Sequence, residues 1–444
     1  MLKTFKLGGI HPPENKFSAG QAIRNAELPK VVSIPVAQHI GTPSIAVVAK
    51  GDKVKVGQLI AKSGGFVSAN IHSSVSGTVA KLDQVPDSLG YPKQAIIINV
   101  DGDEWLESID LSDTLVKECD LDGPAIVQKI NECGIVGLGG ATFPTHVKLV
   151  PPKGMKAEYL LINGVECEPY LTSDHRLMLE KSDEILVGTS LLMKALNVDK
   201  AMIGIENNKP DAISLLKEKS SQYKGVQVVP LKVKYPQGGE KQLIKAATGR
   251  EVPSGALPIA VGCVVSNVGS AFAVYEAVQK NKPLFERVVT ITGKSVTSPG
   301  NYLVRIGIAV RELIEAAGGI PDDTGKIVNG GPMMGKALNN IDVPVSKGTS
   351  GIILFPENES KRPEIKPCIR CAKCISACAL NLEPQLLATL SERGLFERAE
   401  KERITDCMEC GSCSYICPAG RPLLDYIRLG KSTVIKIARQ RNIK

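Results

Sequence analysis

Two runs of four cysteines constrain this chain more than any other feature. The first run is Cys368, Cys371, Cys374 and Cys378, and the second is Cys407, Cys410, Cys413 and Cys417. Both have the spacing Cys-x2-Cys-x2-Cys-x3-Cys, which in two-cluster ferredoxins places three thiolates on one [4Fe–4S] cluster and the fourth on the other. The spacing therefore predicts two clusters that exchange a ligand. The predicted ligand sets are Cys368, Cys371, Cys374 and Cys417 for one cluster, and Cys407, Cys410, Cys413 and Cys378 for the other.

Two other interpretations of the cysteines fit less well. Structural zinc sites usually pair two Cys-x2–4-Cys knuckles and need no third and fourth thiolate at this spacing, twice over. Disulfides are not expected for cysteines clustered in an intracellular chain. Pro418 follows the second run, and its ring fixes the backbone angle φ at that position. Ala379 stands at the matching place after the first run, so the backbone there lacks this restraint, but no cluster ligand is lost. The scattered cysteines are predicted to be small buried apolar residues, namely Cys119, Cys133, Cys167 and Cys263.

Length and composition indicate a multidomain globular protein. The 444 residues suggest about three domains, and 43% apolar with 23% charged residues is ordinary for soluble proteins. The most apolar stretch, 257–274, contains polar residues and glycine or proline breaks, so no transmembrane helix is expected. Residues 1–20 lack an apolar h-region, so no signal peptide is expected and the chain should stay in the cytoplasm.

The net charge of +8 is concentrated near the C-terminus. Between Arg421 and Lys444 the chain carries seven basic residues and only one acidic residue, Asp425. Tyr426 is the single aromatic residue among them, so a stacking platform is not expected and nucleic acid is not an expected partner. The segment fits an anionic protein or lipid surface, or else an ordinary solvated helix.

A glycine-rich segment lies upstream of the cysteines. Gly137, Gly139 and Gly140 follow a helical stretch that begins at Ala125. Glycines at this density allow backbone amides to approach a phosphate or a flat ring, although many glycine-rich turns are purely structural. About twenty residues later, an apolar strand from Tyr159 ends in polar residues, and ligands of open α/β sheets bind at such carboxyl ends.

These segments resemble a known family. Residues 137–148, 163–169, 235–240 and 265–268 are similar to the FMN- and NADH-binding fold of the 51-kDa subunit of respiratory complex I. The opening KLGGIHPPENK at residues 6–16 and the twin cysteine runs more specifically resemble the RnfC subunit of Rnf complexes. Rnf complexes are membrane-bound, ion-translocating oxidoreductases that couple ferredoxin and NAD. The resemblance covers essentially the whole chain in the same order.

The resemblance implies roles for individual residues. Those expected against FMN are Gly137, Gly139, Gly140, Lys148, Asn163, Glu166, Gly238 and Asn267. Those expected to face NAD(H) are Phe143, Glu168 and Glu240, with Glu168 and Glu240 as candidate catalytic residues. Leu138 and Gly239 replace an Arg and a Glu of complex I, as in the Rnf branch, but Thr142 replaces a glycine expected in both, where a side chain could crowd the flavin.

The other segments have patterns of their own. Residues 40–100 alternate with the two-residue period of strands and resemble a barrel-sandwich hybrid, but no lysine stands at the hairpin tip, so docking or bracing is the expected role. His72 is expected to be packed or solvated rather than a ligand. Residues 287–353 suggest a β-grasp module similar to the soluble-ligand-binding β-grasp (SLBB) domain, and residues 357–363 suggest a linker.

The predicted fold is therefore multidomain, α/β with β-rich parts. The predicted domains are an N-terminal segment and barrel-sandwich hybrid at 1–100, a linker at 101–122, an FMN/NAD(H) domain at 123–285, an SLBB-like β-grasp at 286–355, an α-helical two-[4Fe–4S] ferredoxin domain at 356–425 and a basic tail at 426–444.

The resemblance implies a peripheral subunit on the cytoplasmic side of the cell membrane. It would pass electrons between NAD(H), FMN and two [4Fe–4S] clusters, because a flavin accepts electrons in pairs and releases them singly. Its expected partners are the membrane subunits of the Rnf complex and the complex's ferredoxin-type subunit. Two alternatives stay open: a cobalamin reductase of a diol-utilisation microcompartment, and a non-catalytic cluster-bearing docking subunit. The cobalamin reductases begin at the flavin domain, so residues 6–100 count against the first.

Overall fold

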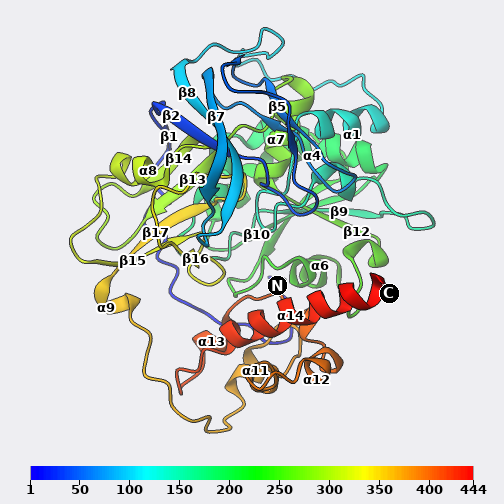
Figure 1. The fold of residues 1–444 in the computed structure, drawn as a ribbon. Coiled ribbons are helices and arrows are strands. Elements are labelled where there is room, and N and C mark those ends of the chain that lie inside the picture. The colour runs from blue at the N-terminus through cyan, green and yellow to red at the C-terminus, as the bar shows by residue number, and fades with distance from the viewer. Residues whose placement is uncertain (1, 444) are drawn as a thin grey trace.

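The computed structural model describes residues 2–443, and Figure 1 shows four parts that follow one another along the chain. A β-rich part comes first, then an α/β domain, then a mixed sheet, and finally a helical domain at one end of the molecule. The N-terminal segment departs from this order. Its residue Gly9 donates a backbone hydrogen bond of 3.0 Å to Ala377 in the helical domain.

The β-rich part consists of a four-stranded sheet of order β2-β8-β7-β4 and a three-stranded sheet of order β3-β5-β6. Val32, Ile34, Ile96 and Ile98 are fully buried, at alternate positions of their strands, which is the pattern expected of strands with one face in a core. The strands are β2 (Val31–Pro35), β3 (Ile45–Ala46), β4 (Lys53–Val54), β5 (Leu59–Lys62), β6 (Ile71–His72), β7 (Ser76–Pro86) and β8 (Pro92–Gly102). His72 is buried, as expected of a packed histidine.

The α/β domain is built on a parallel sheet of order β11-β10-β9-β12. Its strands are β9 (Tyr159–Asn163), β10 (Ala201–Glu206), β11 (Val226–Leu231) and β12 (Cys263–Asn267). Its helices are α1 (Gly123–Glu132), α2 (Thr145–Lys148), α3 (Ser173–Glu180), α4 (Ser182–Leu196), α5 (Pro210–Ser220), α6 (Glu240–Thr248), the short η1 (Pro258–Val261) and α7 (Val268–Gln279). The strands are apolar because helices cover the sheet. Asn163 and Asn267 pair in register at the carboxyl ends of β9 and β12, which places both at one edge of the sheet.

The third part is a six-stranded mixed sheet of order β1-β14-β13-β17-β15-β16. Its elements are β13 (Glu286–Thr292), β14 (Gly300–Arg305), α8 (Val310–Ala316), β15 (Thr324–Asn329), β16 (Lys336–Ala337) and β17 (Gly351–Pro356). Its edge strand β1 (Ile23–Asn25) comes from the N-terminal segment and pairs in parallel with β14. The sequence pattern at 286–355 did not indicate this added strand.

The helical domain begins after α9 (Glu357–Ser360). Its helices are α10 (Lys373–Ala377), α11 (Pro384–Glu392), α12 (Phe396–Lys401), η2 (Ile404–Asp406), α13 (Ser412–Tyr415) and α14 (Leu423–Ile443). The segment predicted as a basic tail lies within α14, whose Ile427 and Val434 are buried in the same core as Leu387 of α11. Within residues 2–443, no helix has the length and apolar character needed to span a membrane.

Candidate functional site: a cysteine cavity against a glycine-rich loop

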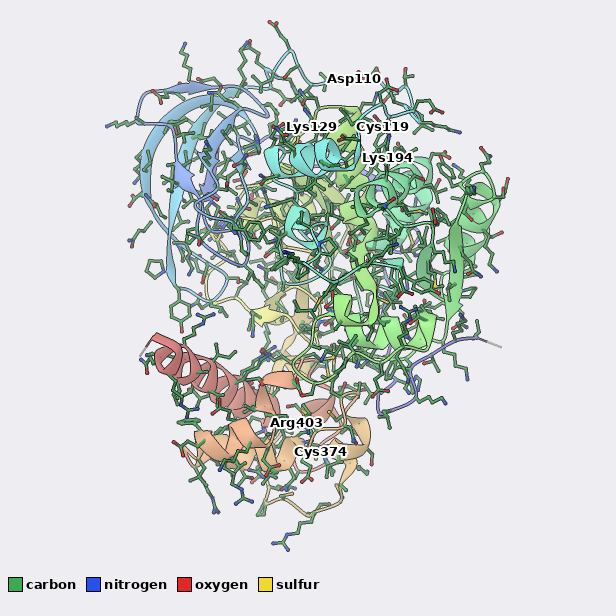
Figure 2. All side chains as sticks on the ribbon, turned by 90° about the vertical axis from the view of Figure 1, so that its right-hand side faces the viewer. Asp110, Cys119, Lys129, Lys194, Cys374 and Arg403 are labelled. Carbon is green, nitrogen blue, oxygen red and sulfur yellow. The ribbon has the colours of Figure 1, made fainter. Side chains whose placement is uncertain are left out.

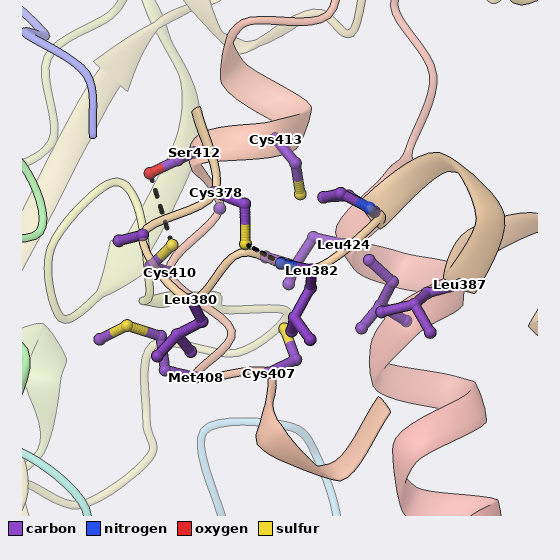
Figure 3. A pocket seen from close by; sticks show the side chains of 14 residues that line it. Cys378, Leu380, Leu382, Leu387, Cys407, Met408, Cys410, Ser412, Cys413 and Leu424 are labelled. Atoms are coloured by element: carbon purple, nitrogen blue, oxygen red, sulfur yellow. Dashed lines mark hydrogen bonds between the residues drawn. The ribbon is translucent and has the colours of Figure 1, made fainter. Parts of the chain in front are cut away.

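Four cysteines line one cavity in the helical domain (Figure 3). Cys378 ends α10, Cys407 follows η2, Cys410 precedes α13, and Cys413 lies in α13. The rest of the lining is largely apolar, with Leu380, Leu382, Leu387, Leu424 and Ile427. This is the ligand set that the cysteine spacing predicts for one cluster, with the fourth ligand supplied by the other run.

The chemistry of these thiols fits an iron–sulfur cluster. Burial raises the pKa of Cys407 to about 11 and that of Cys413 to about 12, so thiolates form there only with a cation to balance them. Cys378 and Cys407 each accept a backbone N–H hydrogen bond of 3.4 Å, from Leu382 and Glu409. Such bonds to sulfur tune iron–sulfur clusters. Within residues 2–443, no group of three or more His, Cys, Asp or Glu side chains is arranged to hold a single metal ion.

The other four cysteines belong to the same domain and differ in their exposure. Cys374 and Cys417 are partly buried and pack against the same core, whereas Cys368 and Cys371 are exposed. Lys366 donates its backbone N–H to Ala419 over 2.9 Å, which holds the loop before Cys368 beside the segment after Cys417. Figure 2 shows Cys374 at the opposite end of the molecule from Cys119. Of the four scattered cysteines, Cys133 and Cys263 are buried, and Cys119 and Cys167 are partly exposed.

The glycine-rich loop lies between α1 and α2, at the carboxyl edge of the parallel sheet. The amide of Gly137 donates to the carbonyl oxygen of Phe143 over 2.9 Å, which closes the loop. Gly139 and Gly140 are exposed. A Cβ on Gly139 would lie 2.6 Å from Nδ2 of Asn267, so only glycine allows this loop to lie against the asparagine.

Two asparagines connect the loops around this edge. Asn267 caps α7 by accepting the N–H of Gly269 over 2.8 Å. Its Nδ2 donates to the carbonyl oxygen of Asn163 over 3.2 Å and to Oδ2 of Asp174 over 2.7 Å. Asn163 in turn donates to the carbonyl oxygen of Gly238 over 2.8 Å. The structure thus brings together the predicted FMN residues Gly139, Asn163, Gly238 and Asn267.

Lys148 and Glu240 face each other across the same edge. The Nζ of Lys148 lies 3.5 Å from Oε1 of Glu240 and donates to the carbonyl oxygen of Val265 over 3.2 Å. Both side chains are partly exposed, at 32% and 42%, so the ammonium and the carboxylate remain accessible to a ligand.

The two remaining predicted glutamates are held by the protein itself. Glu166 accepts the N–H groups of Asp174 over 2.8 Å and His175 over 3.1 Å, at the start of α3. Glu168 accepts the N–H groups of Met333 over 3.0 Å and Met334 over 2.9 Å. Burial raises the pKa of Glu168 to about 7. The carboxylate of Glu168 therefore points to the loop between β15 and β16, and that of Glu166 to a helix end.

Phe143 is partly exposed at the end of the glycine-rich loop, and Thr142 precedes it with a φ of +54°. This left-handed backbone explains why a glycine is expected at position 142. The methyl group of Thr142 lies 2.9 Å from the place that a Cβ on Gly348 would take. The side chain is thus directed toward Gly348, where it packs against a residue without a side chain.

Three further residues organise the site, although the sequence pattern assigns them no role. Lys16 donates to the carbonyl oxygens of Glu166 over 2.9 Å, Glu168 over 2.9 Å and Leu171 over 2.6 Å. Asp174 accepts the side-chain amide of Asn267. Tyr235 donates to the carbonyl oxygen of Cys410 over 2.8 Å. Lys16 and Tyr235 belong to the segments on which the family resemblance rests. The groups that their side chains bind are known only from their contacts in the structure.

The cysteine cavity is in direct contact with residues 235–242, which follow β11 at the carboxyl edge of the parallel sheet. Met408, between Cys407 and Cys410, packs against Gly239, where any Cβ would collide with its methyl group. Gln242 donates to the carbonyl oxygen of Ala379 over 3.1 Å, directly after Cys378. Cys167, Tyr235 and Cys410 share one small apolar core with Ile10. The predicted cluster of Cys378, Cys407, Cys410 and Cys413 therefore lies beside residues 235–242, which include the predicted FMN residue Gly238.

Family models match three parts of the chain. The RnfC barrel-sandwich hybrid domain matches residues 3–103, the Nuo51 FMN-binding domain matches residues 130–276, and the SLBB domain matches residues 288–337. These matches confirm the predicted multidomain fold with its FMN-binding domain. A chain of an NAD+-reducing [NiFe]-hydrogenase in its H2-reduced state has the same fold over 72% of this chain and 66% of its own, with a TM-score of 0.50 and 18% identity.

Relatives of known name match nearly the whole chain, and each is the C component of its complex. The one from the proton-translocating ferredoxin:NAD(+) oxidoreductase complex of Clostridium ljungdahlii is 49% identical over 97% of this chain and 94% of its own length. The one from the Na(+)-translocating complex of Acetobacterium woodii is 43% identical over 99% of both chains. The one from the ion-translocating oxidoreductase complex of a Haemophilus influenzae strain is 38% identical over 97% of this chain but only 65% of its own length.

The fold and the site define an electron-transfer subunit in which an FMN-binding domain lies against a cysteine-rich helical domain of the iron–sulfur type. The flavin, NAD and iron–sulfur character predicted from sequence is consistent with these matches. The chain belongs to the RnfC family, the C component of the ion-translocating ferredoxin:NAD(+) oxidoreductase (Rnf) complexes.

Proposed function

We propose that this chain transfers electrons between NAD(H), FMN and two [4Fe–4S] clusters as the NAD-side subunit of a membrane-bound, ion-translocating ferredoxin:NAD oxidoreductase. The names of the relatives from Clostridium ljungdahlii and Acetobacterium woodii support the complex and its substrates. The proposed partners are the membrane subunits of the Rnf complex and its ferredoxin-type subunit. The proposed location is peripheral, on the cytoplasmic side of the cell membrane.

One observation carries the proposal: the cysteine cavity packs directly on residues 235–242, the segment that carries the predicted FMN residue Gly238. Tyr235 donates to Cys410 over 2.8 Å, and Gln242 donates to Ala379 over 3.1 Å. Because electron transfer weakens steeply with distance, the cluster of Cys378, Cys407, Cys410 and Cys413 is proposed to be the one that exchanges electrons with FMN. The cluster of Cys368, Cys371, Cys374 and Cys417 is then the distal one.

The residues of the glycine-rich edge fit a bound FMN. When bound, FMN accepts two electrons together as a hydride and releases them one at a time. Gly139 allows close approach of a flat ring, and Asn163 and Asn267 fix the loops around it. Lys148 provides a positive charge that stabilises added negative charge. The proposed FMN ligands are Gly137, Gly139, Gly140, Lys148, Asn163, Glu166, Gly238 and Asn267.

The dinucleotide is proposed to contact Phe143, Glu168 and Glu240. Phe143 presents an aromatic face for stacking. Glu240 is partly exposed and paired with Lys148 at 3.5 Å, so it can accept a hydrogen bond from a ribose or an amide. Glu168 acts from a fixed position, because two backbone amides hold its carboxylate.

The test is Glu240→Gln, compared with Glu251→Gln, a change of the same kind at a glutamate whose side chain is 75% exposed. NADH oxidation with an artificial acceptor should fall at least about tenfold in the first variant only, which corresponds to about 1.4 kcal/mol of transition-state stabilisation. Iron, acid-labile sulfide and flavin contents should stay unchanged in both. Loss of iron in Glu240→Gln would contradict the proposed separation between NADH oxidation and cluster binding, and full activity would contradict the proposed role of Glu240.

The two alternatives are distinguished by activity. The family-model match at residues 3–103 to the RnfC barrel-sandwich hybrid counts against a microcompartment cobalamin reductase. Reduction of cob(II)alamin at a rate comparable to that of the artificial acceptor would favour that reductase instead. A protein that contains iron and sulfide but oxidises no NADH with any acceptor would indicate a docking subunit.

A further inference from the structure

The loop that carries the first ligands of the distal cluster is exposed along its whole length. Every residue from Lys361 to Lys373 is exposed, including Cys368 and Cys371. We call these residues the distal loop. The proposed distal cluster thus has two of its four ligands at the surface.

The distal loop is strongly basic. It carries five basic residues, Lys361, Arg362, Lys366, Arg370 and Lys373, and one acidic residue, Glu364, for a formal charge of +4. Lys361 pairs with Glu357 at 2.9 Å, and Arg362 pairs with Asp425. Among the described residues, Lys366, Arg370 and Lys373 form no ion pair, so their charge is available to a partner.

Two large apolar side chains stand among these charges. Ile365 is 63% exposed and Ile369 is 68% exposed, on either side of Cys368. Exposed apolar residues surrounded by charged ones are typical of protein–protein interfaces, in which a small apolar centre is enclosed by a polar rim. A charged patch that binds only a lipid headgroup would not need to lie beside a redox centre.

We infer that the distal loop is the docking surface for an acidic electron-carrier protein, which exchanges single electrons with the distal cluster. This inference rests on the proposed function, since it requires an iron–sulfur cluster at Cys368, Cys371, Cys374 and Cys417. When a reduced carrier binds, one electron leaves its metal centre, which is oxidised, and enters the distal cluster, which is reduced. No proton or leaving group is involved. Charge complementarity increases the association rate of such partners by about 10- to 1000-fold.

The experiment measures the second-order rate constant for electron transfer from a chemically reduced plant-type [2Fe–2S] ferredoxin, an acidic carrier, to the anaerobic holoprotein by stopped-flow absorbance. The rate constant of the unaltered protein should fall steeply as the salt concentration rises, because salt screens attraction beyond about 10 Å. The variant Lys366→Glu, Arg370→Glu, Lys373→Glu should react at least about tenfold more slowly at low salt. Lys366→Glu alone, two residues from the nearest cysteine, should give a smaller decrease in the same direction.

A matched control carries the same change of charge elsewhere. Lys153, Lys217 and Lys224 are exposed residues of the α/β domain, and the variant with all three replaced by Glu should react like the unaltered protein. Iron and sulfide contents are measured in every variant, so that a lost cluster is not mistaken for lost docking.

Three outcomes would overturn the inference. The first is a rate constant independent of salt in the unaltered protein. The second is an equal decrease in the control variant. The third is an unchanged ferredoxin rate in the distal-loop variant; if binding to phosphatidylserine vesicles is lost in the same variant, the loop would be assigned to a membrane instead. NADH oxidation with a small neutral quinone, measured on the same preparations, tests the proposed function separately, and its failure would not be confused with any of these.

Discussion

Tyr235 of the α/β domain donates its hydroxyl hydrogen to the carbonyl oxygen of Cys410, 175 residues later in the chain, over 2.8 Å. The same hydroxyl lies 3.4 Å from Oε1 of Glu168. One side chain of the predicted FMN and NAD(H) domain therefore contacts both Glu168 of its own domain and the predicted cluster ligand Cys410. The relative position of the two proposed redox centres depends on this contact and a few like it.

Replacing Tyr235 by Phe should slow electron transfer from the flavin to the clusters by about two- to tenfold, because a lost buried hydrogen bond weakens domain contact by about 0.5–1.5 kcal/mol. Stopped-flow absorbance after mixing with NADH follows cluster reduction. Tyr302→Phe is the matched control, since Tyr302 is a buried tyrosine that donates to Ser298 over 3.1 Å within the mixed sheet. Equal rates in the two variants would show that the Tyr235 contact does not set the transfer rate.

Gly239→Ala should disturb the same domain contact, because the flexible ends of Met408 and Gln242 must shift to make room for the new Cβ. A Cβ at this position would lie 2.5 Å from Oε1 of Gln242 and would collide with Met408. We expect slower cluster reduction by NADH and faster proteolysis between residues 356 and 373, with FMN retained. Gly20→Ala is the control, because nothing lies within 4 Å of a Cβ there. If Gly239→Ala reduces its clusters at the normal rate, the packing of Met408 on this loop is not needed.

The exchange of ligands between the cysteine runs predicts a crossed pattern of losses. Cys378→Ser and Cys407→Ser should abolish the same electron paramagnetic resonance signal, although these cysteines belong to different runs, because both line one cavity. Cys417→Ser and Cys368→Ser should abolish the other signal. If Cys378→Ser instead removes the signal that Cys368→Ser removes, each run binds its own cluster and the assignment is wrong.

The buried residue Lys347 should make the free energy of unfolding depend on pH above neutrality. Its ammonium group is buried and donates to the carbonyl oxygens of Asn70 over 2.9 Å and Gly134 over 2.7 Å, with burial lowering its pKa to about 7. Between pH 7 and about 10.5 the unfolded chain binds a proton at this lysine that the folded chain releases. The free energy of unfolding should therefore rise with pH across this window and fall as pH decreases toward 7.

Lys347→Met removes this titration. Between about pH 7 and pH 9, the midpoint temperature of unfolding should increase in the unaltered protein more than in Lys347→Met, as measured by circular dichroism. Lys153→Met changes an exposed lysine and should leave the increase as it is. Parallel pH profiles for all three proteins would show that Lys347 is charged in the folded state throughout this range.

Patterns that are local in the chain could be predicted from the sequence. The three-residue spacing of the cysteines restricts which thiols can surround one cluster, and the alternation around Ile96 and Ile98 indicates a strand with one buried face. The glycine-rich loop and the polar ends of β9 and β12 also lie together as expected, because parallel strands end at one edge of a sheet.

Contacts between distant segments required the tertiary structure. No periodicity indicates that β1 completes the sheet of β14, or that Lys16 binds three carbonyl groups at least 150 residues away. The place of Glu166 and Glu168 in a motif predicts contacts with FMN and the dinucleotide, and only the structure shows that their carboxylates also accept from the start of α3 and from the amides of Met333 and Met334. Spacing along a chain determines which groups can act together locally. Shape and charge complementarity between folded surfaces decide which cysteines line a cavity beside residues 235–242 and which face solvent.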